Sequence, residues 1–395
     1  MVLGFICFRF SDWGHLFWGT GMRKIAFLYL LPDNMSGLLN KINSQAEAVF
    51  DLDRNIEFII FYELEKPVIN SISANIIFEK LPKFKFKTGF FFTPRYIVNY
   101  VNQKKYDLIF SRIYGFSPFF FFFFRKRKFK FIVEYHTKIL NEYIALGRFD
   151  LALAYRMFKK ISDRVIDAKI CVTKEISNIE SFSKPVVTIT NGFKHRKLDL
   201  PAFQYFRGNS LGILMLCSKL QPWHGIERFF ESVINWEVNN PELKVRIDIV
   251  GEIYESDFKE SKLPKHVLFH GSKNDIEIIE LARNANMGLS SLGLFLKNMD
   301  EACPLKSREY ISLGLPFIYG YKDHDVNLKS DILGYFVPND KSLLNLENIL
   351  DWLIKIDTNR EQYFLNWLEL RKKISWETKM KEFLNFANEI LVCEQ

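Results

Sequence analysis

Two glutamates in one short segment flank the start of a predicted helix, and their carboxylates could accept hydrogen bonds from the hydroxyl groups of a ligand. Glu301 and Glu309 are separated by seven residues in the stretch EACPLKSREYISLGLP, with Pro304 and Lys306 between them. Proline is poor inside a helix but favoured at its first position, so a helix is predicted to begin at Pro304 or Leu305. Glu301 then lies in the preceding loop, and Glu309 lies just over one turn into the helix, on its inward side.

The start of this predicted helix suits a diphosphate. A helix N-terminus presents free backbone N–H groups and a partial positive charge, here at Leu305, and Lys306 adds a full charge. Glu309 lies about 6 Å along the axis from Leu305, within reach of ribose hydroxyls. Glu301 falls on the other side of the phosphates, where a sugar would lie. An ordinary surface helix with two solvated glutamates is the alternative.

A second segment, CSKLQPWHGIER at residues 217–228, directly follows a predicted strand. Lys219 and His224 flank a short turn at the carboxyl end of that strand, and Gly225 opens the next helix. Both side chains could meet a pyrophosphate held by the first segment. A buried histidine with only protein partners is the alternative for His224.

The first half of the chain offers two further candidates. Gly37 stands at the start of a predicted helix, where a backbone could approach phosphates closely. A simple helix-start loop capped by Ser36 explains the same residues equally well. His136 follows a predicted strand at 131–135, and a histidine at a strand's carboxyl end suits contact with a reacting sugar.

Short apolar strands alternate with amphipathic helical stretches along the chain, which is typical of parallel sheets covered on both faces. Two such series, each long enough for its own sheet, predict an α/β protein with two doubly wound, Rossmann-like domains facing a cleft. Strands are predicted at residues 25–31, 56–62, 107–111, 131–135, 169–173, 186–190, 211–217, 245–250, 267–269, 287–291, 316–319 and 335–337. Helices are predicted at residues 38–50, 95–103, 142–161, 226–238, 276–284, 305–313, 343–356 and 376–391.

The domain boundary is expected in HRKLDLPAFQYFRGN, which is polar and broken by proline and glycine. We therefore predict a first domain at 22–198, a second at 199–375, and a C-terminal helix at 376–395 that packs on the first domain. Residues 1–21 lack a period leading into the first strand, so we expect a non-native or disordered leader, with Met22 as the natural start. A membrane-touching aromatic tail is the alternative for this leader.

Composition excludes several classes of protein. The five cysteines lie far apart, so neither a disulfide framework nor a cysteine zinc site is expected, which suits a reducing cytoplasm. The net charge of +8 permits an anionic partner. We expect no nucleic-acid partner, because no such module is recognisable. The Asp-x-Asp matches at 51–53 and 323–325 lack a strand-end context, so no metal site is predicted.

One segment combines aromatic and basic residues in the way that surfaces docking on anionic membranes do. Six consecutive phenylalanines are followed by RKRK, and a helix there is expected on the outside of the first domain. Six phenylalanines surround a helix, so some must face solvent, a partner or lipid. The phenylalanine-rich composition of the whole chain, 40 of 395 residues, is the competing explanation. The predicted docking residues are Phe119, Phe120, Phe123, Arg125, Lys126, Arg127 and Lys128.

These motifs, together with VGE at 250–252, FHG at 269–271 and ITNGF at 189–193, resemble glycosyltransferase family 4, and most closely its members in bacterial capsular and surface polysaccharide synthesis. The resemblance implies the GT-B fold and a retaining mechanism. It implies that Glu301 touches the donor sugar, that Glu309 binds ribose, and that Asn191 faces the cleft. His136 would be catalytic beside Glu301. Residues implied in donor binding are Lys219, His224, Lys306, Glu309, Leu305, Gly37 and Asn191.

The function expected from this resemblance is transfer of a hexosyl-type sugar from a nucleoside diphosphate sugar to a saccharide hydroxyl, on a lipid-linked acceptor. No metal or other cofactor is expected, because protein cations would stabilise the leaving diphosphate. A cytoplasmic location, peripheral on the inner face of the plasma membrane, would fit. A nucleotide-sugar epimerase of the same fold is one alternative, and it would need further carboxylates in the first-domain cleft, where Glu134 is the single candidate. A non-catalytic scaffold protein is another.

Overall fold

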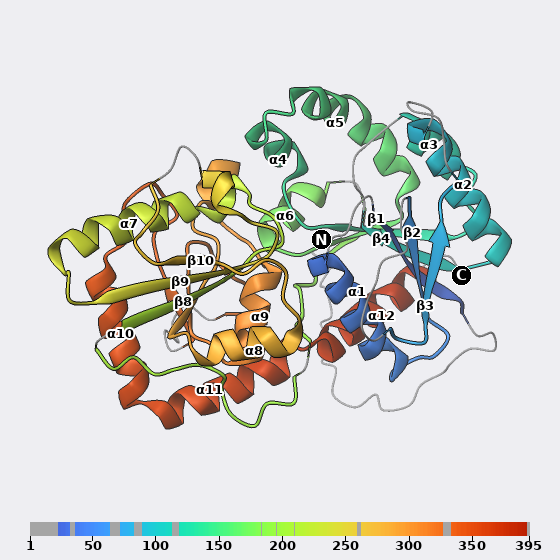
Figure 1. The fold of residues 1–395 in the computed structure, drawn as a ribbon. Coiled ribbons are helices and arrows are strands. Elements are labelled where there is room, and N and C mark those ends of the chain that lie inside the picture. The colour runs from blue at the N-terminus through green and yellow to red at the C-terminus, as the bar shows by residue number, and fades with distance from the viewer. Residues whose placement is uncertain are drawn as a thin grey trace, which may run out of the picture.

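The computed structural model describes residues 23–31, 36–63, 72–82, 89–112, 118–182, 184–194, 196–208, 210–258, 262–326 and 333–392. The expected leader at residues 1–21 lies outside these ranges. The described chain forms two domains side by side, each built on a parallel sheet (Figure 1).

The first domain is built on a seven-stranded parallel sheet in the order β3-β2-β1-β4-β5-β6-β7. The order reverses next to β1, as in doubly wound folds, where ligands bind outside the carboxyl ends of the strands. Its elements are β1 (Ile25–Leu31), α1 (Ser36–Phe50), β2 (Glu57–Tyr62), β3 (Ile76–Lys80), α2 (Gly89–Lys104), β4 (Leu108–Arg112), α3 (Pro118–Phe124), β5 (Lys130–Tyr135), α4 (Ile139–Ala145), α5 (Phe149–Ser162), η1 (Asp163–Val165), β6 (Ala168–Cys171), α6 (Lys174–Glu180) and β7 (Val186–Thr188).

The second domain has a six-stranded parallel sheet in the order β10-β9-β8-β11-β12-β13. Its elements and the following helices are β8 (Ser210–Leu216), η2 (Pro222–His224), α7 (Ile226–Asn239), β9 (Lys244–Val250), η3 (Glu255–Phe258), β10 (Val267–Phe269), α8 (Asp275–Arg283), β11 (Met287–Leu289), η4 (Leu294–Lys297), α9 (Leu305–Leu313), β12 (Phe317–Tyr319), β13 (Gly334–Phe336), α10 (Leu346–Thr358), α11 (Arg360–Lys373) and α12 (Trp376–Val392).

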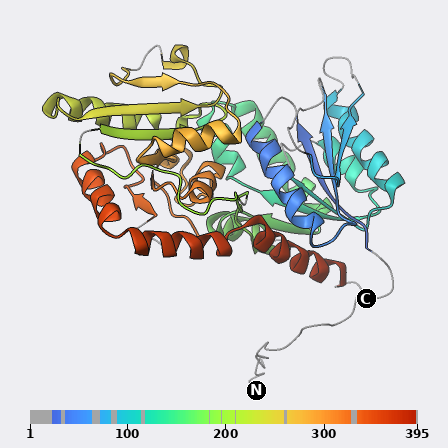
Figure 2. The same cartoon turned by 60° about the horizontal axis from the view of Figure 1, so that its bottom comes forward.

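The C-terminal helix crosses back to the first domain, as predicted. Figure 2 shows α11 and α12 running in succession from the second domain to the first. On α12, Phe383 packs against Phe27 of β1 and Phe110 of β4, with ring centroids 4.7 and 5.1 Å apart. Together α1 and α12 cover one face of the first sheet, and α2, α3 and α5 cover the other. The chain therefore crosses between the domains twice, once after β7 and once before α12.

Four elements differ from the sequence prediction. The single helix expected at 142–161 is two helices, α4 and α5, because Gly147 between them adopts a left-handed conformation with φ of 67°. The edge strand β3, the short helix α6 and the helix α11 were not predicted. The structure has all the predicted strands, with ends shifted by at most a few residues. The predicted domain boundary at 198/199 lies in the segment between β7 and β8.

Candidate functional site

The helix predicted from Pro304 is α9, which begins at Leu305 with Pro304 in an extended conformation directly before it. It ends where Gly314 takes a left-handed conformation, with φ of 67°. A side chain at Gly314 would also collide with Pro201, so this stop requires glycine. The first turn of α9 therefore carries Lys306, and Glu309 follows one turn later.

Lys306 is buried, 9% exposed, and its Nζ has no hydrogen-bond partner among the described residues. Burial lowers the pKa of Lys306 to about 8, although the nearby Cys217 acts in the opposite direction. Burying an ammonium group without a partner is costly, so such groups are rarely kept without a ligand. An anion bound at the first turn of α9 would supply the missing partner.

His224 lies close to Lys306 and is held by the turn that follows β8. The backbone N–H of Gln221 donates to its Nδ1 over 3.2 Å, and the Cys217 Sγ lies 3.1 Å from the same nitrogen. Burial and the charges of Lys306 and Lys297 hold the pKa of His224 well below its usual range. A neutral imidazole that accepts at Nδ1 carries its proton on Nε2. His224 is therefore a neutral hydrogen-bond donor here, and it would meet a pyrophosphate through its Nε2–H.

Gly225 is required for this turn to approach the neighbouring strand end. It adopts φ of 64°, and a side chain there would lie 2.6 Å from the backbone nitrogen of Gly293. The backbone N–H groups of Leu292 and Gly293 donate to the carbonyl oxygens of His224 and Trp223. The turn after β8 is thereby fastened to the loop after β11, and both lie at carboxyl ends of central strands.

Lys297, at the end of η4, is a residue that sequence reasoning missed. Its Nζ lies 4.2 Å from the ring centre of Trp223, donates to Thr137 over 3.1 Å and pairs with Glu142 at 3.3 Å. Thr137 and Glu142 belong to the first domain, so Lys297 bridges the two domains at the cleft. Burial lowers the pKa of Lys297. No spacing in the sequence singles out this lysine, because its partners come from residues about 160 positions away.

Glu301 lies at the contact between the two domains and is half-buried. Its Oε2 accepts from the backbone N–H of Glu175 over 2.9 Å, at the first turn of α6. In return, the Oε2 of Glu175 accepts from the backbone N–H groups of Glu301 and Asp300, at 2.9 and 3.0 Å. Glu175 also pairs with Lys138 at 2.5 Å. The loop that carries Glu301 is thus held to the first domain by a reciprocal pair of glutamates.

Glu309 pairs with an arginine of the segment that connects the domains. The Arg196 Nη2 lies 2.6 Å from the Glu309 Oε2, and Arg196 also contacts Asp275 at 3.1 Å and Ser312 at 3.0 Å. Burial would lower the pKa of Arg196, but Glu309 and Asp275 raise it above its usual value. The Glu309 side chain is 29% exposed, although the Oε2 that lies beside Arg196 is itself buried. Arg196 fixes the orientation of the carboxylate that was predicted to bind ribose.

His136 lies at the carboxyl end of β5 among cations of the first domain. The Arg112 Nε donates to its Nδ1 over 3.2 Å. Burial, followed by the charges of Arg112, Lys41 and Lys297, lowers the pKa of His136 well below its usual range. Beside it, Lys41 forms a buried ion pair with Glu134 at 2.6 Å. His136 is thus a neutral side chain at the edge of the cleft.

Three of the predicted donor-binding residues, Asn191, Gly37 and Lys219, lie in surroundings that differ from those of Lys306 and His224. Asn191 is buried, and its Nδ2 donates to the carbonyl oxygen of Cys303 over 2.6 Å, so it holds the loop between Glu301 and α9. Gly37, at the start of α1, faces the second domain, since a side chain there would lie 4.0 Å from the Oγ of Ser218. Lys219 is exposed beyond the end of β8.

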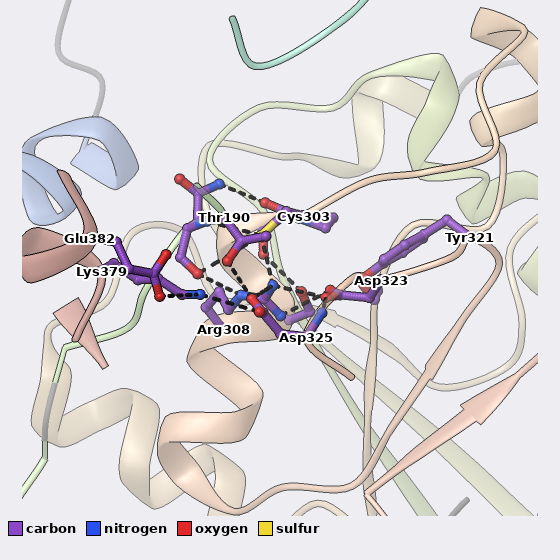
Figure 3. Close-up of polar contacts among 12 residues, drawn as sticks. Thr190, Cys303, Arg308, Tyr321, Asp323, Asp325, Lys379 and Glu382 are labelled. Atoms are coloured by element: carbon purple, nitrogen blue, oxygen red, sulfur yellow. Dashed lines mark hydrogen bonds and ion pairs between the residues drawn. The ribbon is translucent and has the colours of Figure 1, made fainter. Parts of the chain in front are cut away.

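A buried network of charges around Arg308 of α9 connects the second domain to the two segments in which the chain passes between the domains, after β7 and at the start of α12 (Figure 3). The Arg308 guanidinium donates to both carboxylate oxygens of Asp323 at 2.9 Å and to Asp325 at 3.0 Å. Asp325 pairs with Lys379 of α12 at 3.2 Å and accepts from Thr190. Arg308 Nε also donates to the carbonyl oxygen of Asn191 over 2.8 Å.

This network gives the Asp-x-Asp sequence at 323–325 a structural role. Cys303, Asp323 and Asp325 form a group whose donor atoms lie close enough together to hold a metal ion. The Arg308 Nη2 lies within 2.7 to 3.0 Å of a donor atom of each of these three residues. The guanidinium therefore occupies the place that a cation would take.

The phenylalanine run forms α3, and its side chains are mostly turned inward. Phe120 stacks on Phe124 at 4.1 Å between ring centroids, and Phe123 is 8% exposed. Phe119 is also partly buried, whereas Phe122, which was not among the predicted docking residues, is 48% exposed. Arg127 pairs with Asp167 at 2.8 Å, while Arg125, Lys126 and Lys128 remain exposed. In this conformation Phe123 cannot contact a membrane. No helix among the described residues combines the length and apolar character needed to cross a bilayer.

Two parallel-sheet domains that meet at the carboxyl ends of their strands, with a C-terminal helix returning to the first, define the GT-B fold. Several solved structures of this fold are similar over nearly the whole chain. A glycosyltransferase from Rickettsia africae ESF-5 has 13% identity over 93% of this chain and 99% of that one, with a TM-score of 0.58. The apo form of the lipopolysaccharide outer core galactosyltransferase WaaB has 12% identity over the same shares, also with a TM-score of 0.58.

A further similar structure carries the name of an epimerase. The UDP-N-acetylglucosamine 2-epimerase structure from Listeria monocytogenes has 8% identity over 94% of this chain and 98% of that one, with a TM-score of 0.51. No protein-family model and no curated protein sequence matches the chain. At such low identities these similarities establish the fold alone, so the activity has to be inferred from the residues of the candidate site.

Proposed function

We propose that the protein is a glycosyltransferase that takes its sugar from a nucleoside diphosphate sugar. The observation that carries this proposal is the buried Lys306 ammonium, in the first turn of α9 and beside His224, which has no hydrogen-bond partner among the described residues. A diphosphate bound there would accept from Lys306, from the free backbone N–H groups of α9 and from the Nε2–H of His224. Glu309, held in place by Arg196, would accept hydrogen bonds from the ribose.

The same groups would assist departure of the diphosphate. As the bond between the sugar and the phosphate breaks, negative charge grows on the leaving oxygen, and donors already in place stabilise it without reorganisation. We propose that these protein groups take the role that a divalent metal has in other transferases, so that no metal or other cofactor is used. Lys297 would contribute its charge from the side of the cleft that the first domain closes.

Glu301 and His136 are the proposed contacts of the transferred sugar. Glu301 would orient the donor sugar through the carboxylate oxygen that does not contact α6, and the neutral His136 would support its hydroxyls. We further propose that the reaction retains the anomeric configuration, with the leaving phosphate accepting the proton of the attacking hydroxyl. His136 suits this route, since burial and neighbouring cations lower its pKa and make it a poor base.

The proposed acceptor is the hydroxyl of a lipid-linked saccharide in surface polysaccharide synthesis, and the proposed transferred group is a hexose. Similarity in fold to WaaB, whose structure is that of a lipopolysaccharide galactosyltransferase, supports this class of acceptor. Such an acceptor would place the protein at the inner face of the plasma membrane.

An epimerase is the second candidate, favoured by the similar fold of the Listeria structure. Among the described residues, three first-domain carboxylates lie near the second domain: Glu134, Glu142 and Glu175. Each is already paired with a lysine, at 2.6, 3.3 and 2.5 Å respectively. A carboxylate held by a lysine is a poor acid or base, so we favour the transferase.

The test is incubation of the purified protein with a panel of nucleoside diphosphate sugars. Release of nucleoside diphosphate, increased by an added saccharide and lost in Lys306→Met, would support the transferase. A new sugar isomer that remains attached to the nucleotide would identify an epimerase instead. Binding of no member of the panel, measured as the absence of a thermal shift, would contradict both enzymatic proposals.

A further inference from the structure

The first domain exposes an apolar stripe along α5 and the loop before it. Phe149, Leu153 and Met157 are 68%, 60% and 59% exposed, and they follow one another at intervals of four residues. Side chains at this spacing lie on one face of a helix. Three further exposed apolar side chains extend the stripe at its two ends: Ile144, Leu146 and Ile161. Contiguous exposed apolar surface is rare on proteins that have no partner there.

Cations flank this stripe. Arg156, Lys160 and Arg164 are exposed, and none of them forms an ion pair with a described residue. The acids in the same stretch are already engaged: Asp150 with Arg148 at 2.9 Å, and Asp163 with two lysines. The stripe therefore presents apolar side chains beside uncompensated positive charge.

The stripe also adjoins the cleft. In Figure 1, α4 and α5 lie along one edge of the first domain, with α4 on the side of the second domain. The start of α4 reaches the cleft directly, because the Asn141 Nδ2 donates to the carbonyl oxygen of Lys297 over 3.0 Å. A surface bound to the stripe would therefore lie next to the helix that contacts the second domain.

We propose that the stripe formed by residues 144–164 docks the protein on an anionic lipid membrane. An apolar helix face flanked by cations suits the boundary between acyl chains and head groups. The apolar side chains contact the acyl chains there, and the cations pair with anionic head groups. A protein partner would more often offer acids within a shaped interface. Such a membrane would deliver the lipid-linked acceptor, so the choice of membrane rests on the proposed function. The stripe is proposed as the docking surface in preference to the phenylalanine run of α3, where Phe122 is the exposed phenylalanine among the described residues.

The experiment is co-sedimentation of the full chain with vesicles of phosphatidylcholine alone or mixed with phosphatidylglycerol, without donor or acceptor. We expect binding to the mixed vesicles and little binding to phosphatidylcholine alone. The double variant Leu153→Glu with Met157→Glu should weaken binding by at least about tenfold, because two exposed apolar side chains that would enter the membrane are lost. Replacing Arg156 and Lys160 by glutamine should weaken binding to the mixed vesicles by roughly fivefold per cation.

Matched controls are Phe122→Glu on α3 and Val238→Glu on α7, since each replaces an exposed apolar side chain by the same acid. These controls should bind vesicles as the unchanged protein does. Equal loss in Phe122→Glu, no loss in the double variant, or no vesicle binding by the unchanged protein would overturn the proposal. A wild-type dimer that the double variant converts to a monomer, without vesicle binding, would assign the stripe to a second copy of the chain. A failed donor assay with intact vesicle binding would refute the transferase and not the docking surface.

Discussion

Replacing Lys306 by methionine is predicted to stabilise the protein while it weakens the binding of nucleoside diphosphates. Methionine keeps most of the volume of the side chain and removes a buried charge that has no hydrogen-bond partner in the described part of the chain. The pKa of Lys306 falls from 10.5 to about 8 on burial, which corresponds to roughly 3 kcal/mol at about 1.4 kcal/mol per pKa unit. Since the group is charged below pH 8, nearly all of this cost is present at neutral pH.

The stability of Lys306→Met is measured by denaturant unfolding at neutral pH. We expect a higher midpoint, with a gain of up to roughly 3 kcal/mol. The control is Lys341→Met, which removes an exposed lysine of the same domain and should leave the midpoint unchanged. The gain should shrink as the pH rises from about 8 toward 10.5, because the wild-type lysine then loses its proton in the folded state first.

Binding of nucleoside diphosphates to the same variant is measured by titration calorimetry with a panel of bases. Loss of a charge-assisted hydrogen bond costs about 1.5 to 3 kcal/mol, so affinity should fall by roughly 10- to 150-fold. A variant that is less stable than the wild type and binds nucleotides equally well would refute the reasoning. Such a result would mean that Lys306 stabilises the folded protein and does not bind the phosphates.

Four further predictions follow from the same contacts. Binding of a nucleoside diphosphate near pH 8.5 should be accompanied by proton uptake by Lys306, because the bound anion raises its lowered pKa; calorimetry in two buffers of different ionisation enthalpy measures this uptake. Arg196→Met should lower nucleotide affinity by about tenfold by releasing Glu309, with partial rescue in Arg196→Lys, both measured by calorimetry. Glu301→Gln should keep its contact with α6 and the nucleotide affinity, while turnover falls by at least about 100-fold in a nucleotide-release assay. Arg308→Met should destabilise the fold by about 3 to 5 kcal/mol in denaturant unfolding, because two buried aspartates lose their cation. An unchanged midpoint would show that this network does not stabilise the contact between the domains.

Local patterns in the sequence were sufficient to predict much of the fold. Continuous apolar runs located the central strands, and Pro304 located the start of α9. The edge strand β3 was missed because its residues Ile76–Lys80 are only partly buried and lack a clear period. Gly147 divides a continuous helical pattern, and its left-handed conformation shows only in three dimensions.

The candidate site was predictable where one segment contains it and not where two domains meet. Lys306 and His224 each follow a recognisable strand–turn–helix pattern, so spacing was sufficient to select them. Lys297 and Arg196 acquire their partners from distant parts of the chain, and no local pattern distinguishes them from surface cations. The local composition of the phenylalanine run does not show which of its side chains are buried: Phe120 and Phe124 pack against Phe131 of the core.

The central claim is that the phosphates of a nucleoside diphosphate lie at the first turn of α9. A crystal structure of the protein with its best-binding nucleoside diphosphate tests this claim most directly. The account predicts phosphate oxygens within hydrogen-bond distance of the Lys306 Nζ, the His224 Nε2 and the first backbone N–H groups of α9. Phosphates bound elsewhere, with the Lys306 ammonium still lacking a partner, would contradict it.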